Sequence, residues 1–251
     1  MGSANAITQQ PLFYLFIAVT IVLTLGYTWG RRWNKQIYLS ALNALVDTLR
    51  PKDQNFTNIG GLIGYHANLI PHRNKFIRRV DATITLLPRQ SWLYLPFSKL
   101  TRRYDRLFIT FLFSKKAMKL VGEGHLIEVG YSKFRGPKIT NEERLESDEI
   151  RWGSRSFLRY WENESVKGEL ESLTSTLPIP GEIRHVAIVP ERDQGFMFMV
   201  PKKNHVGEVF PTVFNWLNEL LDRRFREQEA AKRESAPDGD TAGENRKNHT
   251  K

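Results

Sequence analysis

The 251-residue chain has no cysteine, and it has no charged residue or histidine from Gly2 to Gly30. The first absence excludes disulfides, thiolate zinc sites and cysteine nucleophiles, and it suits a domain that faces a reducing cytosol. The second leaves an uncharged run, Pro11 to Gly30, with the sequence PLFYLFIAVTIVLTLGYTWG. A bilayer core about 30 Å thick needs about 20 apolar residues in a helix. Residues 11–30 are therefore predicted to form a membrane-spanning helix.

A cleaved secretory signal is the alternative interpretation of this run. Such a signal has a basic segment before a shorter apolar core, and small residues at the cleavage site. Here the cations Arg31, Arg32 and Lys35 follow the run, and Tyr27 and Trp29 stand where an aromatic belt would meet the headgroups. Because Lys and Arg mark the cytoplasmic side, we expect an uncleaved anchor with the N-terminus outside and the rest of the chain in the cytosol.

Positive charge is concentrated in the part of the chain that follows the anchor. Residues 31–122 contain 17 basic and 4 acidic residues, a net charge of +13, whereas residues 123–222 have a net charge of −5. Cations beside an anchor attract anionic headgroups, and a basic folded surface also suits a polyanion such as ribosomal RNA. Both interpretations are kept. The candidate residues for contact with lipid or RNA are Arg31, Arg32, Lys35, Arg78, Arg79, Arg102, Arg103 and Arg106.

Hydrophobic periodicity after the anchor predicts an α+β domain. Residues 31–50 have an apolar stripe at helical spacing, which predicts an amphipathic juxtamembrane helix. The expected strands are Phe76–Leu86, Leu107–Phe113, His125–Tyr131, Glu149–Gly153, Ile183–Val189 and Phe196–Val200, and the further helices are Ser154–Thr176 and Gly207–Phe225, with a short helix or irregular crossing over Arg89–Arg103. This mixture predicts a mostly antiparallel sheet with helices packed on one side.

Local signals refine the boundaries of these elements. Glycines predict a turn-rich loop from Asp53 to Gly64, since their spacing fits no phosphate-binding motif. Ser154 is the expected N-cap of its helix, and Pro211 is expected in the first turn of the last helix. Residues 227–251 have too few large apolar side chains to offset the entropy of ordering and are predicted to form a disordered tail, with helix allowed at its start.

Residue patterns typical of catalysis or metal binding are missing from the sequence. The six histidines are scattered, and none has a partner at the spacing of a helical metal motif. No G-x-S-x-G elbow is present. Asp81 and Asp105 stand among arginines, so ion pairing is expected for them. We therefore expect a protein that is not an enzyme and that uses no cofactor or metal.

The order of these elements resembles a known family. It comprises an anchor, an amphipathic helix, an N-F-T stretch at Asn55 to Thr57, and a strand and basic crossing over Val80 to Arg106 that lead into an apolar strand. It continues with a Gly153-Ser154-Arg155 turn into a helix, a strand hairpin, and a Pro-containing helix that ends in basic residues over Glu208 to Arg226. This order is similar to the cytosolic part of the calumin-like family, the coiled-coil subunit of the PAT complex of the endoplasmic reticulum. The likeness covers most of residues 12–226.

The resemblance implies an accessory factor at the Sec translocon and the ribosome, which assists insertion of multipass membrane proteins beside a small chaperone subunit resembling Asterix. Two features of the family are missing here: the acidic calcium-binding segment before the anchor, and the long basic C-terminal coiled coil. Calcium binding is therefore not expected. The short cysteine-free chain suggests a prokaryotic, in particular an archaeal, relative.

The sequence thus predicts five segments. They are a short external N-terminus (1–10), a transmembrane helix (11–30), a juxtamembrane helix (31–50), a cytosolic α+β domain (51–226) and a disordered tail (227–251). The membrane would be the plasma membrane in a prokaryote and the endoplasmic reticulum in a eukaryote. A membrane-tethered scaffold that binds anionic lipid and a protein partner, without a role in insertion, is the alternative function.

Overall fold

A single 39-residue helix, α2 (Pro11–Leu49), joins the uncharged run to the folded domain. The computed structural model describes residues 10–130, 139–140 and 142–234. Between residues 11 and 25 almost every apolar side chain of α2 is exposed. From Gly26 onward one stripe is buried at intervals of mostly three or four residues: Gly26, Gly30, Asn34, Ile37, Ala41, Leu42, Leu45 and Leu49. The predicted anchor and juxtamembrane helix are therefore one continuous helix, and its N-terminal part is long and apolar enough to cross a membrane.

The domain is built on one nine-stranded sheet in which every neighbouring pair is antiparallel. The strand order is β1-β2-β3-β4-β9-β8-β5-β7-β6. The strands are β1 (Pro51–Asn58), β2 (Gly64–Pro71), β3 (Ile77–Thr85), β4 (Arg106–Phe113), β5 (Gly124–Glu128), β6 (Glu146–Trp152), β7 (Arg155–Trp161), β8 (Ile183–Val189) and β9 (Gln194–Met199). The predicted fold class, an α+β domain with an antiparallel sheet, is confirmed.

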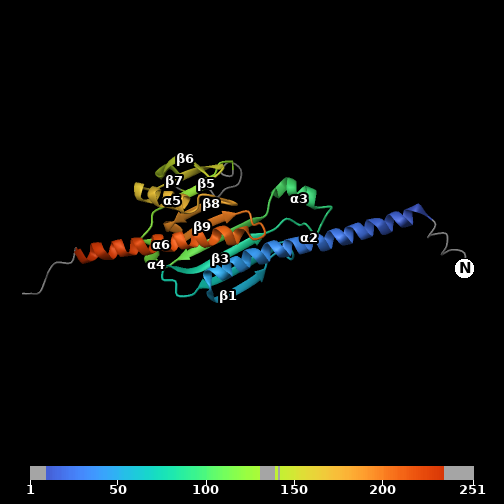
Figure 1. Cartoon of the computed structure of the whole chain (residues 1–251), viewed down its shortest axis with the longest axis horizontal. Helices are drawn as coiled ribbons and strands as arrows, with labels where there is room; N and C mark the ends of the chain where they lie inside the picture. The colour runs from blue at the N-terminus through green and yellow to red at the C-terminus, as the bar shows by residue number, and fades with distance from the viewer. Residues whose placement is uncertain (1–9, 131–138, 141, 235–251) are drawn as a thin grey trace, which may run out of the picture.

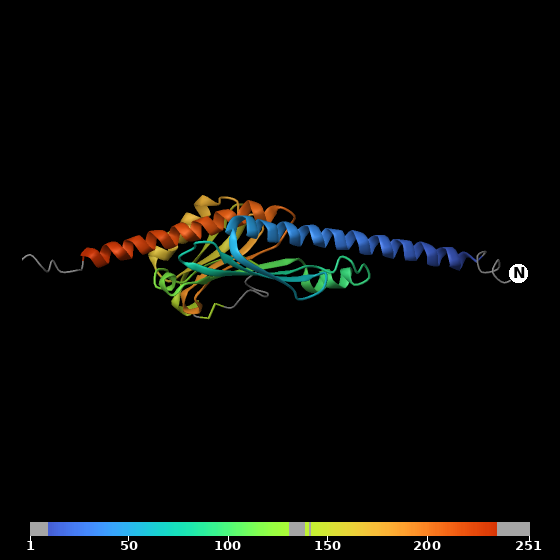
Figure 2. The same cartoon turned by 90° about the horizontal axis from the view of Figure 1, so that it is seen from below.

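The long helices lie together on one face of the sheet (Figures 1 and 2). Helix α6 (His205–Glu234) packs beside α2, and α5 (Glu164–Thr176) covers β5 and β7. The free ends of α2 and α6 point in opposite directions along the long axis of the molecule (Figure 2). The short helices are α3 (Leu95–Arg102) and α4 (Lys115–Met118), with one-turn helices η1 (Glu142–Arg144) and η2 (Pro190–Arg192).

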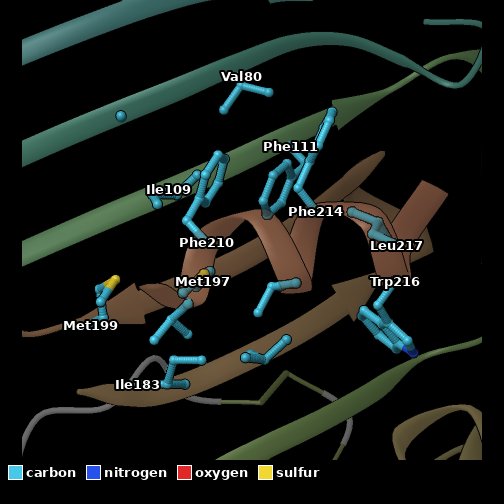
Figure 3. Packing of buried hydrophobic residues seen from close by; sticks show 14 of the residues in the cluster. Val80, Ile109, Phe111, Ile183, Met197, Met199, Phe210, Phe214, Trp216 and Leu217 are labelled. Atoms are coloured by element: carbon cyan, nitrogen blue, oxygen red, sulfur yellow. The ribbon is translucent and has the colours of Figure 1, made fainter. Parts of the chain in front are cut away.

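Aromatic side chains of α6 and β4 form the centre of the core (Figure 3). The ring of Phe111 lies 6.1 Å from that of Phe210 and 6.3 Å from that of Phe214, and both α6 rings point at the sheet. Burial of each such ring stabilises the fold by about 1.5–3 kcal/mol. These contacts join the last helix to the middle of the sheet.

The predicted loop over Asp53–Gly64 is wrong in its first half, whereas residues 59–63 form a turn as predicted. Residues 51–58 form β1, which pairs with β2, a strand that the sequence patterns did not predict. Strand β1 is the edge of the sheet, and all its side chains after Pro51 are exposed. Since neither face of β1 is buried, its sequence has no alternation of apolar and polar residues, and main-chain pairing alone defines the strand.

The predicted helix over Ser154–Thr176 is also wrong in its first half. Arg155–Trp161 is strand β7, which forms a hairpin with β6 around Gly153, whose φ is +62°. Helix α5 begins only at Glu164, and its N-cap is Asn163, not Ser154. The Asn163 side chain accepts a hydrogen bond of 3.1 Å from the backbone N–H of Val166.

Helix α6 is longer at both ends than predicted. Because it begins at His205, Pro211 lies inside the helix and not in its first turn. The helix ends at Glu234, eight residues into the segment predicted as a tail. The rest of that segment, 235–251, lies outside the described residues, as do residues 1–9 and Tyr131, the last residue of a predicted strand.

Replacement of Asn163 by Ala should destabilise the fold by about 1 kcal/mol, because the helix loses its capping acceptor. Ser154→Ala, at an exposed turn position, should change the stability by less than about 0.5 kcal/mol. Urea unfolding of the full chain in detergent micelles, followed by tryptophan fluorescence, measures both variants. Equal losses for the two variants would contradict this assignment of the cap.

Candidate functional site at the α2–α3 junction

Most of the predicted contact cations lie at one end of the domain, where α2 leaves it. Arg31, Arg32 and Lys35 are exposed on α2 directly after the apolar run. Arg103 and Arg106 lie where the chain returns from α3 into β4, and Arg106 pairs in the sheet with Thr85. Arg102 ends α3, and its side chain lies outside the described part of the structure.

Arg78 and Arg79 lie at the opposite end of the sheet. The register pairs Ile77 with Phe113 at that end of β3. The six residue steps from Arg79 to Thr85 span about 20 Å of extended chain. Both arginines are exposed, and Arg79 donates to Asp81 over 3.0 Å. The eight predicted residues therefore belong to two separate ends of the domain.

Two glycines let the segment before α3 approach α2 closely. A side-chain Cβ at Gly30 would overlap the backbone carbonyl of Arg89, and a Cβ at Gly26 would overlap the ring of Trp92. Both glycines are in the apolar run and are buried by these contacts. The last two turns of the run therefore pack against the domain itself.

A buried polar network fixes this approach. Arg89 donates to both carboxylate oxygens of Asp105, over 2.9 and 2.6 Å, and also to the side-chain oxygen of Asn34, over 2.9 Å. Asp105 accepts from the backbone N–H of Leu87, and Asn34 donates to the carbonyl of Leu87. The Arg89 and Asp105 side chains are only 17% and 5% exposed. Both ends of the crossing between β3 and β4 are thereby tied to α2.

These contacts confirm one sequence-based prediction and extend it. Asp81 and Asp105 were expected to be ion-paired, and their partners are Arg79 and Arg89. The role of Asn34 was not predicted, because its partners lie 53 to 56 residues away in the sequence. An asparagine on the otherwise apolar, buried stripe of a helix is the signal that indicates a buried polar contact.

A hollow of about 680 Å³ lies between α2, α3 and the segment that leads from β9 to α6. Its apolar lining includes Trp33, Ile37, Leu87 and Val200, and its basic lining includes Arg89, Lys99, Arg103, Lys202 and Lys203. Arg89 and Lys202 are ion-paired within the chain, to Asp105 and Glu182. A hollow lined by both cations and apolar side chains suits a ligand that has an anionic group and a hydrocarbon part.

A second cavity, of about 210 Å³, lies on the sheet face opposite the helices. His125 and His185, 60 residues apart in sequence, meet there, with Nδ1 of His125 3.4 Å from Nε2 of His185. Nε2 of His125 lies 3.0 Å from a carboxylate oxygen of Glu123. Sequence reasoning treated these histidines as isolated, because neither segment by itself indicates the antiparallel register that joins their strands. Within the described residues, no group of three or more His, Asp or Glu side chains could hold a metal ion.

His185 is fully buried, and burial lowers its pKa well below the usual value for histidine; the neighbouring His125 lowers it further. The charged or titratable groups that line the same cavity are Glu123, His125 and Arg192. The neutral imidazole of His185 packs against the edge of Phe196, with the ring centroids 5.3 Å apart. The cavity thus contains a neutral, packed histidine.

Comparison of the chain with protein-family models gave no match, and comparison with curated proteins gave none either. The functional argument therefore depends on the residues and on the geometry of the α2–α3 junction.

Replacement of Asp105 by Asn should destabilise the chain by about 3–5 kcal/mol, because it leaves the buried Arg89 without its counter-charge. The matched control is Asp81→Asn, which breaks the more exposed pair with Arg79 and should cost no more than about 1 kcal/mol. Urea unfolding of the full chain in micelles compares the two variants. A loss at Asp105 as small as the loss at Asp81 would show that the network does not hold the junction.

The stability of the full chain should fall as the pH drops below about 6.5, the usual pKa of histidine. In that range the unfolded chain binds a proton that His185 in the folded chain does not bind, so the slope reaches about 1.4 kcal/mol per pH unit. His185→Gln should make this dependence shallower, whereas His72→Gln, at an exposed position, should leave it unchanged. Unfolding curves between pH 7.5 and 5 measure the slopes, and identical slopes in all three proteins would contradict the assignment.

Proposed function

We propose that this chain is a membrane-anchored, non-enzymatic accessory factor whose cytosolic domain acts at the Sec translocon and the ribosome during insertion of multipass membrane proteins. The observation that carries the proposal is the continuity of α2, which runs without a break from an exposed apolar segment into the core of a basic domain. The resemblance of the sequence to the calumin-like family supports the same function, although the helix expected after Gly153 is strand β7 in the structure.

The packing at the junction favours a permanent anchor over a cleaved signal, although a signal sequence also satisfies the length and composition of the apolar run. Gly26 and Gly30 lie against Trp92 and Arg89. Cleavage of the run would remove these contacts and expose that part of the domain. Permanent anchoring keeps them.

Charge supports a cytosolic domain. Arg31, Arg32 and Lys35 follow the span directly, and positive charge of this kind remains on the cytoplasmic side. The domain would then lie on the side of the membrane where ribosomes work, at the plasma membrane of a prokaryote or the endoplasmic reticulum of a eukaryote.

The two groups of cations suit two different polyanions. Those at the α2–α3 junction would lie near anionic headgroups, within the range at which each charge adds about 1 kcal/mol to binding. Arg78 and Arg79 are exposed and lie far from the free end of α2, where they would meet ribosomal RNA, with Arg79 exchanging its pair with Asp81 for a phosphate. A small membrane-embedded chaperone subunit resembling Asterix is the proposed partner within the membrane.

Purified full chain in micelles should sediment with ribosomes at low salt and dissociate as salt rises, because phosphate contacts release counterions. The double variant Arg78→Ala, Arg79→Ala should bind more weakly and reduce the slope of log K against log salt by about 1 for each arginine that neutralises a phosphate. Lys99→Ala with Arg103→Ala, at the other end of the domain, should bind ribosomes as the wild type does. A wild-type chain that stays off ribosomes and Sec complexes at low salt overturns the proposal.

A second function, a tethered scaffold for anionic lipid and a protein partner without a role in insertion, is favoured by the hollow at the α2–α3 junction. Native mass spectrometry of the micelle-solubilised chain separates the two functions. Under this second function, anionic lipid remains bound, the Lys99→Ala, Arg103→Ala variant loses it, and no ribosome binding is seen in the sedimentation experiment.

A further inference from the structure

We propose that the segment Ser91–Arg103, termed the α3 hairpin, is a second membrane contact, with its apolar side chains buried in the leaflet from which α2 emerges. The occupant of this apolar surface is thus lipid, at the boundary between headgroups and acyl chains. The inference rests on the proposed anchoring by α2 and adds a membrane site that anchoring alone does not require.

The first argument is depth along α2. Trp92 packs against Gly26, which lies five residues before Arg31, the first cation after the span. At 1.5 Å per residue, this contact is about 7.5 Å deeper in the membrane than the backbone of Arg31. Helices that lie in the interface bury their apolar face about 5–10 Å into the headgroup and acyl boundary. The hairpin therefore begins at interfacial depth.

The second argument is exposure. Leu93 is 86% exposed and Leu100 is 79% exposed, and Trp92, Tyr94 and Phe97 are about half exposed. Phe97 and Leu100 of α3 are three residues apart and share one side of the helix, whereas Ser98 is buried toward the domain. Leu93 lies in the turn that leads into α3. A contiguous group of large, exposed apolar side chains is unusual on the surface of a soluble protein and marks a binding surface.

The third argument is position. Figures 1 and 2 both show α3 beside α2 and beyond the end of the strands, toward the free end of α2. Trp92 contacts Gly26, which lies within one turn of Trp29 on α2. The rings of Trp29 and Trp33 are 4.8 Å apart and are also partly exposed. Aromatic residues gathered at one level are typical of a membrane interface.

The charge of the α3 hairpin is also consistent with a position at the membrane interface. Residues 91–103 contain three cations and no acidic residue. Lys99 and Arg103 are exposed and line the hollow beside α2. Long basic side chains on an interfacial helix extend to the headgroups while their stems lie along apolar surface. The hollow would then open at the level of lipid phosphates.

The hairpin cannot swing away from this depth without breaking buried contacts. Leu87 and Arg89 precede it and Asp105 follows it, and all three are joined through the network that includes Asn34 of α2. A membrane that contains α2 would therefore meet the hairpin at a depth set by the fold.

Spin labelling tests the proposal directly, since the absence of native cysteine allows single labels in the full chain. Leu93→Cys and Leu100→Cys place nitroxides on the hairpin, and Ile179→Cys, at an apolar residue that is 74% exposed in a remote loop, is the matched control. Each protein is reconstituted into vesicles of phosphatidylcholine and phosphatidylserine. All three labels lie on exposed side chains, so the packing of the domain is preserved.

The ratio of oxygen accessibility to nickel-chelate accessibility should be severalfold higher at 93 and 100 than at 179, because oxygen partitions into lipid and the chelate stays in water. Equal ratios at the three positions overturn the inference. A low ratio of oxygen accessibility to nickel-chelate accessibility at 93 and 100 in the lipid vesicles, with protection of these labels from the chelate only in native membranes, also overturns the inference. The surface would then be covered by a protein and not by lipid.

A fourth label separates this inference from the anchor. Ile21→Cys lies in the apolar run and is exposed in the isolated chain. A lipid-type ratio at 21 with water-type ratios at 93 and 100 refutes the membrane contact of the hairpin and leaves the anchoring intact. A water-type ratio at 21 as well refutes both.

Discussion

The close approach of α2 to the crossing between β3 and β4 is the constraint on which the rest of this structure depends. Because Gly26 and Gly30 have no side chains, α2 directly contacts the ring of Trp92 and the backbone of Arg89. The adjoining buried pair, Arg89 and Asp105, is satisfied by Asn34 and by the backbone of Leu87. A buried ion pair of this kind adds little stability over an apolar substitute, but it tolerates only one geometry. The main effect of the junction is therefore to fix the orientation of α2 relative to the sheet, and its contribution to stability is small.

That orientation determines what each end of the molecule presents. The antiparallel register puts the Thr85 and Arg106 ends of β3 and β4 at the junction, and the Ile77 and Phe113 ends far from it. As a result, one end of the sheet combines cations, aromatic residues and the hollow, while the other end carries Arg78 and Arg79. The basic part of the chain forms β1 to β4 and the acidic part forms β5 to β9, so the division of charge along the chain becomes a division across the sheet.

Sequence patterns predicted the parts of the fold where one face of an element is buried. The stripe of α2 after residue 30, the alternation of β3 and the hairpin of β8 and β9 were predicted in this way. The sequence patterns do not predict strand β1, because both of its faces are exposed to solvent. The sequence predicts a helix in place of strand β7 because Phe157 and Trp161 are four residues apart, a spacing that also places two buried residues on the same face of a strand.

The candidate site was predicted only in part, for a similar reason. The sequence shows which residues are cations. Their distribution between the two ends of the domain follows from strand register, which is set by long-range pairing. The same holds for the meeting of His125 and His185. The contact of Trp92 with Gly26 joins segments 66 residues apart, and glycines in an apolar run do not reveal what packs against them.

The continuity of α2 has a mechanical consequence for a tethered protein. A helix of 39 residues is about 58 Å long, and α2 has no break at which it could hinge between the apolar run and the sheet. A domain on a flexible linker samples a hemisphere of positions above the bilayer. If the apolar run crosses a membrane as proposed, the unbroken helix would hold the domain at one height and tilt, and a membrane-embedded partner would have to match that height.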